Sequence, residues 1–159
     1  MINAQVPWEL AGQTSTTVRV SYPGVASTDT PVLLAPSLPG IFGVANSDGT
    51  LNSPSNPAKP GDFITIYGTG GGPTSPAGVT GAFWPLTTPL PSLTLKVSVT
   101  MGGENANVLY SGASPQSSSG IFQINVRVPA DLPPSVTSSL NLTIGDASSP
   151  TLPIAIGTR

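Results

Sequence analysis

Hydrophobic and polar residues alternate with a period of two along several short stretches of this sequence. The alternation is clearest at residues 18–22, 95–101 and 140–144, and it is typical of strands with one buried face. Weaker versions cover residues 2–6, 31–35, 62–67, 107–110, 121–128 and 152–156. No window has a helical apolar period, and the proline density would interrupt most helices. About nine short strands with Gly-, Pro- and Asn-rich connections predict an all-β fold, specifically an Ig-like β-sandwich.

An internal repeat organises these strands. Residues 2–10 recur at residues 124–132, where five of nine positions are identical at an offset of 122. Without a gap, the same offset places apolar residue on apolar residue further along: Val18 on Leu140, Val20 on Leu142, Tyr22 on Ile144, Pro31 on Pro153, Val32 on Ile154 and Leu34 on Ile156. A slip of one residue would turn every side chain of a strand to its other face. The constant register therefore indicates two copies of one structural unit.

The repeat predicts two parts of unequal completeness. Residues 1–36 correspond to the C-terminal strands of a partial first module, and residues 37–159 hold a complete second Ig-like module. Three isolated strands bury little surface by themselves. They therefore pack on the complete module, pair with another chain, or belong to a neighbouring module. Because residues 1–36 resemble residues 123–158, a strand swap between copies is one expected route to self-association.

Composition excludes several classes of function. Only 12 of 159 residues are charged, the net charge is −2, and the five basic residues are scattered, so we expect no nucleic-acid partner. Prolines interrupt every long apolar stretch, so we expect no membrane insertion. The chain has no cysteine and no histidine. It therefore has no disulfide, no thiolate nucleophile and neither of the commonest metal ligands, and we expect no metal and no cofactor.

The first residues carry no basic or apolar segment of the kind found in signal peptides. This is compatible with an excised piece of a longer secreted protein.

Several motifs together resemble a C-terminal module of secreted Acidobacteria (Solibacter-type) proteins. They are residues 46–58 (NSDGTLNSPSNPA), 60–70 (PGDFITIYGTG), 99–103 (VTMGG) with 108–112 (VLYSG), and 123–129 (QINVRVP). More distantly, this order of motifs is similar to the IPT/TIG branch of immunoglobulin-like sandwiches. The resemblance implies an Ig-like fold and a secreted or cell-surface location, and it implies no catalytic residues.

Two loops have a superficial likeness to ligand-binding motifs. Residues 68–73 (GTGGGP) follow a strand, but no Lys completes a phosphate-binding loop, so glycines in a turn explain them better. Asn46, Asp48 and Asn52 could offer oxygen ligands to calcium, but no acidic residue closes such a loop before Asp62. An Asp-Gly turn explains the same residues.

The candidates for catalysis are weaker still. Asp62 and Glu104 are the pair of carboxylates that a glycoside hydrolase would need, and they would have to face each other across a cleft. Each also fits a strand edge or a hairpin turn. No histidine is present to activate a serine. We therefore expect no enzyme.

The long proline-rich segment at residues 71–92 contains Phe83 and Trp84, and long loops in compact domains are often functional. These rings could dock a partner or stack on sugars, or they could close one edge of the sandwich. Trp8 stands where the second copy has Ala130, and could cover the seam between the N-terminal strands and the module. Phe83, Trp84 and Trp8 are the candidate binding residues.

The sequence as a whole predicts a non-enzymatic, extracellular, structural or adhesive Ig-like module of a larger secreted or surface protein. Its partner would be another protein or a second copy of itself. The alternative is a carbohydrate-binding module that uses the aromatic residues of the 71–92 loop.

Overall fold

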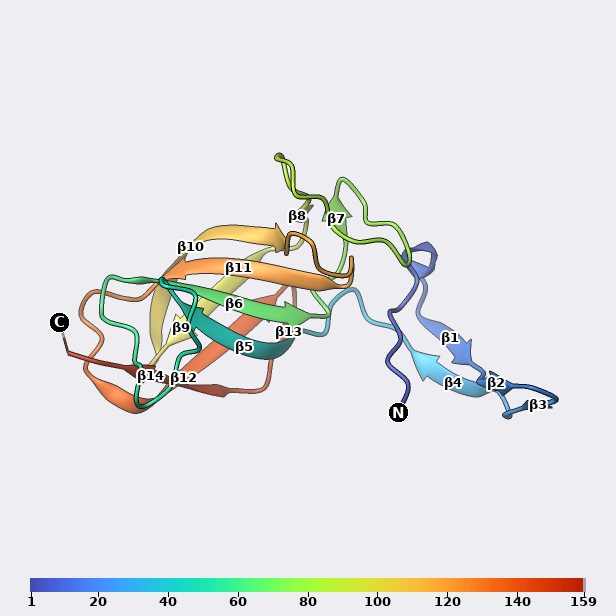
Figure 1. Ribbon diagram of the computed structural model, residues 1–159, viewed down its shortest axis with the longest axis horizontal. Helices are drawn as coiled ribbons and strands as arrows, with labels where there is room; N and C mark the ends of the chain where they lie inside the picture. The colour runs from blue at the N-terminus through green and yellow to red at the C-terminus, as the bar shows by residue number, and fades with distance from the viewer. Residues whose placement is uncertain (159) are drawn as a thin grey trace.

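A computed structural model describes residues 1–158 and confirms the all-β prediction. Figure 1 shows a β-rich body, formed by residues 37–158, and an N-terminal arm, residues 1–36, that projects away from it. The predicted second module, residues 37–159, ends one residue beyond the described part of the chain. Within residues 1–158 no helix is long and apolar enough to cross a membrane.

The body is one long sheet that curls until its two halves face each other. Its strands are β5 (Gly40–Asn46), β6 (Phe63–Thr69), β7 (Thr74–Ser75), β8 (Ser92–Leu93), β9 (Val97–Met101), β10 (Glu104–Ala113), β11 (Ile121–Arg127), β12 (Ser135–Ile144), β13 (Ala147–Ser148) and β14 (Leu152–Ile156). The main path runs β13-β12-β9-β10-β11-β6-β5, with β14 on β12 and β8 on β10. The first residues of β10 pair with β9 and its later residues with β11, with a shift in register between Val108 and Tyr110. The strand β10 therefore belongs to both halves.

The hydrophobic core lies between these halves. Alternate residues of β6, β11 and β12 are buried, as the period-two pattern predicts. The largest fully buried side chains are Ile64, Ile66, Met101, Ile124, Leu140, Leu142, Ile144, Ile154 and Ile156. Burying each such side chain contributes about 1.5–3 kcal/mol. The core thus consists mainly of aliphatic residues at the alternating positions.

The segment between β5 and β6 covers the free edge of β14. The side chain of Asn52 donates from Nδ2 to the carbonyl of Ala155 at 2.9 Å and accepts from its N–H at 2.8 Å. The backbone of Ala58 continues this pairing by donating to Ala155 O at 3.1 Å and accepting from Gly157 N at 2.7 Å. An edge that would otherwise be open to pairing is thereby satisfied within the body.

The arm contains a short helical turn and a β-hairpin. The turn η1 (Trp8–Leu10) is followed by β1 (Ser15–Val18), β2 (Ser21–Tyr22), β3 (Val25–Ala26) and β4 (Thr30–Leu33). Strand β1 pairs with β4, and β2 pairs with β3 at the tip. In Figure 1 the hairpin extends away from the body, on the side opposite the C-terminus.

The arm hairpin has the same register as the hairpin β12–β13–β14 of the body. Adding 122 to the residue numbers of five arm pairs gives five pairs of the body. They are Thr16↔Val32 with Ser138↔Ile154, Thr17↔Pro31 with Ser139↔Pro153, Val18↔Thr30 with Leu140↔Leu152, Ser21↔Ala26 with Thr143↔Ser148, and Tyr22↔Val25 with Ile144↔Ala147. The offset found in the sequence is thus also the offset between the two hairpins.

Local side-chain bonds repeat as well. Ser27 Oγ accepts a hydrogen bond from Val20 N at 3.0 Å, and Ser149 Oγ accepts one from Leu142 N at 3.3 Å. Each serine also donates to the carbonyl of the residue that follows it. These bonds draw the second half of each hairpin back onto the first.

The strand predicted at residues 2–6 is absent, and that prediction is wrong. The equivalent residues of β11 pair with β6 on one side and β10 on the other. The arm has neither neighbour among the described residues, so its first residues have no strand to pair with. For the same reason the strand predicted at 18–22 is divided between β1 and β2.

Candidate functional site

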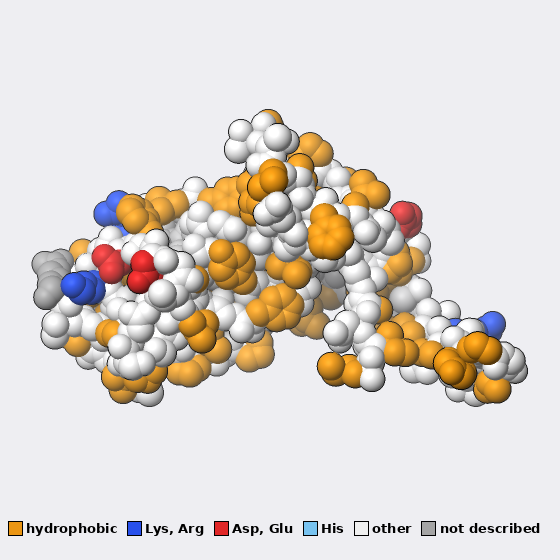
Figure 2. All heavy atoms as spheres, viewed as in Figure 1, with side chains coloured by type: hydrophobic (Ala, Val, Ile, Leu, Met, Phe, Trp, Pro, Cys, Tyr) orange, Lys and Arg blue, Asp and Glu red, His pale blue; other side chains and the backbone are white. Residues whose placement is uncertain are grey.

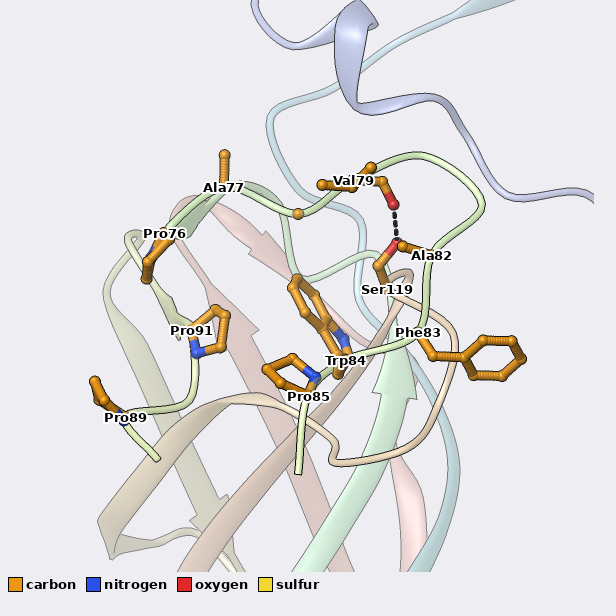
Figure 3. Close-up of a pocket in the computed structure, with 11 residues that line it drawn as sticks. Pro76, Ala77, Val79, Ala82, Phe83, Trp84, Pro85, Pro89, Pro91 and Ser119 are labelled. Carbon is orange, nitrogen blue, oxygen red and sulfur yellow. Dashed lines mark hydrogen bonds between the residues drawn. The ribbon is translucent and has the colours of Figure 1, made fainter. Parts of the chain in front are cut away.

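The loop at residues 76–91 is closed by the pairing of β7 with β8 and carries two of the candidate aromatic residues. Trp84 is buried, with 6% of its surface exposed, and its Nε1 donates to the carbonyl of Ile121 at 2.8 Å. Its backbone N–H donates to Ser117 O at 2.8 Å. Phe83 is 73% exposed and points away from Trp84 (Figure 3). Trp84 therefore anchors the loop, and Phe83 faces outward.

Trp8 lies at the seam between the arm and this loop. Its ring meets that of Trp84 edge to face, with centroids 5.9 Å apart and planes at 71°. Its Nε1 donates to Ser119 Oγ at 3.2 Å. The indole occupies the place where a Cβ at Gly78 would lie, so glycine is required there for the close approach. The half-buried Trp8 thus links the arm to the body.

Polar groups reinforce this seam. Ser119 Oγ accepts from Gln5 Nε2 at 2.8 Å and donates to Val79 O at 2.7 Å, the bond drawn in Figure 3. The hydroxyl of Thr80 donates to Glu9 Oε2 at 2.6 Å, and this bond lowers the pKa of Glu9. These bonds fix the base of the arm to the loop of the body.

Beside Trp84 the loop borders an open cavity of about 260 Å³. Four prolines, Trp84 and one hydroxyl make up much of its wall: Pro76, Pro85, Pro89, Pro91, Trp84 and Ser119 (Figure 3). None of its lining residues is acidic or basic. The cavity therefore suits an apolar group and offers no group for acid–base chemistry.

A second hollow, of about 250 Å³, lies where β10 changes register, and is lined by Ser92 and residues 108–111. The hydroxyl of Tyr110 donates to the carbonyl of Ala113 at 2.8 Å. Partial burial raises the pKa of this phenol. The ring thus supports the bulged strand.

The two carboxylates considered for catalysis lie in turns. Asp62 accepts a hydrogen bond from Lys59 N at 3.0 Å, immediately before β6. Glu104 begins β10 opposite Met101, after a two-residue turn in which Gly102 and Gly103 have φ values of 56° and 89°. Neither carboxylate lines either cavity, and residues 1–158 contain no group of three acidic side chains placed to hold a metal.

The side chains considered for calcium form hydrogen bonds within the β5–β6 segment. Asp48 Oδ1 accepts from both the backbone and the hydroxyl of Thr50, which lowers the pKa of Asp48. Asn46 Oδ1 accepts a hydrogen bond from the side-chain amide Nδ2 of Asn52. The side-chain oxygen of Asn52 in turn accepts a hydrogen bond from the backbone N–H of Ala155. These oxygens serve the Asp-Gly turn and the edge of β14.

The hairpin of the arm has two unlike faces. On its outer face Arg19 Nε and Asp29 Oδ1 form an ion pair at 2.5 Å, which raises the pKa of Arg19. At the equivalent positions Thr151 donates to Asn141 at 2.6 Å. The outer face thus carries a polar pair at these positions in both copies, and in the arm the exposed Leu33 lies on the same face.

The inner face of the arm hairpin is apolar and mostly exposed. We define it as the side chains of Val18, Val20, Tyr22, Val32 and Leu34, which are equivalent to the fully buried Leu140, Leu142, Ile144, Ile154 and Ile156. Val20 is 46% exposed and Tyr22 80%, whereas Leu142 and Ile144 are 0% exposed. Figure 2 shows hydrophobic side chains at the surface of the projecting hairpin. Four of these five positions, all but the half-buried Leu34, are exposed in the arm, whereas their equivalents form a core in the body.

Comparison with known proteins gives no relative: no family model, curated protein or solved structure matches this chain. The inner face of the arm was not among the residues singled out from the sequence. The signal for it was present, because the repeat aligns these residues with the apolar positions of a predicted strand.

Proposed function

We propose that this chain is a non-enzymatic structural module of an extracellular or cell-surface protein, which makes protein–protein or self-assembly contacts through the inner face of its arm. The proposal includes the Ig-like character of the sandwich and its place in a larger protein. The single observation that carries it is the exposure of Val20 and Tyr22 at positions equivalent to core residues. Contiguous exposed apolar side chains mark interaction surfaces in folded proteins.

The chemistry of the described residues supports a role without catalysis. The candidate carboxylates form turn hydrogen bonds, and the larger cavity is lined by prolines, aromatic rings and a hydroxyl. Activated nucleophiles and general bases require a titratable partner within hydrogen-bond reach. The arm, by contrast, offers an apolar surface with a free strand edge, and such surfaces support binding.

The carbohydrate-binding alternative has one observation in its favour, the exposed ring of Phe83. Sugar-binding platforms need open aromatic faces, whereas Trp84 is buried and Trp8 packs on it. Because only one of the three candidate rings is free, contact through the arm is the function that the geometry supports better.

We expect the molar mass to rise from monomer toward dimer over about a hundredfold range of concentration, because apolar faces on separate chains can cover each other. Light scattering after size exclusion measures this. The double variant Val18→Asp with Val20→Asp places charge on the inner face and should remain monomeric throughout. The matched control, Thr17→Asp with Ser21→Asp, carries the same charge on the opposite face and should associate like the parent chain.

A parent chain that stays monomeric over the whole range would contradict association of separate chains through the arm. Equal loss of association in both double variants would show that charge, and not the inner face, controls the contact.

A further inference from the structure

The C-terminal hairpin shows what a covered version of the arm looks like. Strand β12 pairs with β9 from Leu140↔Met101 to Ile144↔Val97, and its inner side chains are buried in the core. The equivalent residues of the arm, 18–22, have no strand on that edge among the described residues. The arm therefore lacks two things at once, a strand beside it and a sheet beneath it.

Second copies of this chain cannot supply every arm with both a neighbouring strand and a covering sheet. Each copy has one set of covering strands, residues 37–122 of the body, and two hairpins of the same register, one in the arm and one at residues 135–156. If copies exchange hairpins, each body still covers one hairpin. One hairpin per chain then remains uncovered, so an exchange gains no buried core.

The inner faces also differ in shape. Val18, Val20 and Val32 are smaller than their equivalents Leu140, Leu142 and Ile154. Tyr22 is larger than Ile144, which is fully buried. Missing methylenes leave voids and an extra ring overpacks a core, and each costs free energy. The body of this chain thus fits its own hairpin better than it fits the arm.

We infer that the partner of the arm is a second β body with the strand pattern of residues 37–122 and no final hairpin of its own. This inference rests on the proposed function and names its partner. A strand of this body, equivalent to β9, would pair antiparallel with residues 18–22, in the register that β9 has with β12. Its apolar face would cover Val20 and leave space for the ring of Tyr22.

The repeat itself supplies the test. At the offset of 122, Met1 takes the place of Gln123, so residues 37–122 can be placed directly before Met1 in an extended chain. The extended chain has two sets of covering strands and two hairpins. Both hairpins can therefore be covered, whichever set each hairpin packs against. We expect amide exchange in residues 15–33 to slow by roughly a hundredfold or more relative to the parent chain.

Variants make the result specific. The triple change Val18→Leu, Val20→Leu and Tyr22→Ile in the extended chain gives the arm the same residues as Leu140, Leu142 and Ile144 of β12, which the body already buries. In the extended chain this triple variant should slow amide exchange in residues 15–33 still further. Val20→Asp should restore fast exchange in residues 15–33 and leave the amides of residues 135–156 protected. If neither the extended chain nor its triple variant slows exchange in residues 15–33, the inference is wrong.

The two proposals fail separately. Exchange that stays fast in the extended chains, together with self-association that depends on Val18 and Val20, overturns the inference and supports the proposed contact function. Protection in the extended chain, with a parent chain that remains monomeric, supports the inference and overturns association between separate copies.

Discussion

Leu142→Ala is expected to lower the free energy of unfolding of the body by about 2–5 kcal/mol, whereas Val20→Ala changes it by less than about 0.5 kcal/mol. The two residues are equivalent in the repeat, and each occupies the inner face of its hairpin. Leu142 is fully buried, so its truncation leaves a cavity between the two halves of the sheet. Val20 borders solvent, so its truncation leaves none.

Urea unfolding followed by tryptophan fluorescence measures both variants, because Trp84 is anchored in the body. Val99→Ala is a useful second core variant, since Val99 pairs with Leu142 across β9 and β12. Similar decreases in the free energy of unfolding for Leu142→Ala and Val20→Ala would mean that the inner face of the arm is covered within one chain.

Gly70→Ala is expected to destabilise the body by roughly 3 kcal/mol or more, because two separate costs coincide there. Gly70 has a φ of 77°, in the left-handed region that a side chain disfavours. A Cβ at this position would also collide with the backbone carbonyl of Leu38. The close approach is enforced by the hydrogen bond from Leu38 N to Gly70 O at 2.9 Å.

Gly103→Ala separates these two costs. Gly103 has a φ of 89°, but a Cβ there would meet nothing within 4 Å. This variant should therefore lower the free energy of unfolding by only about 1–2 kcal/mol, the cost of the left-handed conformation. Equal losses at the two positions would show that the contact between Leu38 and Gly70 adds nothing to stability. Both values come from the same urea experiment.

The sequence was sufficient to predict the all-β body because its strands bury one face each. The alternation at 140–144 and 152–156 coincides with β12 and β14, whose inner residues lie in the core. The Asp48-Gly49 turn was also predicted, since positive φ at a glycine is a local property. Both kinds of signal are carried by a few neighbouring residues.

Other features depend on partners that a local pattern does not contain. Residues 2–6 have the sequence of a strand but no neighbouring strand, so they form none. The apolar character of Trp84 indicates burial, yet Phe83 beside it is exposed, because the turn of the loop sends the two rings in opposite directions. The edge-to-face contact of Trp8 with Trp84 joins residues 76 positions apart and fixes the base of the arm.

Whether the inner face of the arm is uncovered is tested most directly by comparing backbone amide exchange in the two hairpins of the monomeric parent chain. Both hairpins have the same cross-strand pairing, with the registers Val18↔Thr30 and Leu140↔Leu152. We nevertheless expect the amides of β1 and β4 to exchange far faster than those of β12 and β14, because only the second hairpin is covered by a sheet. Equal protection of the two hairpins in the monomer would mean that the inner face of the arm is already buried, and that the arm is not a free binding surface.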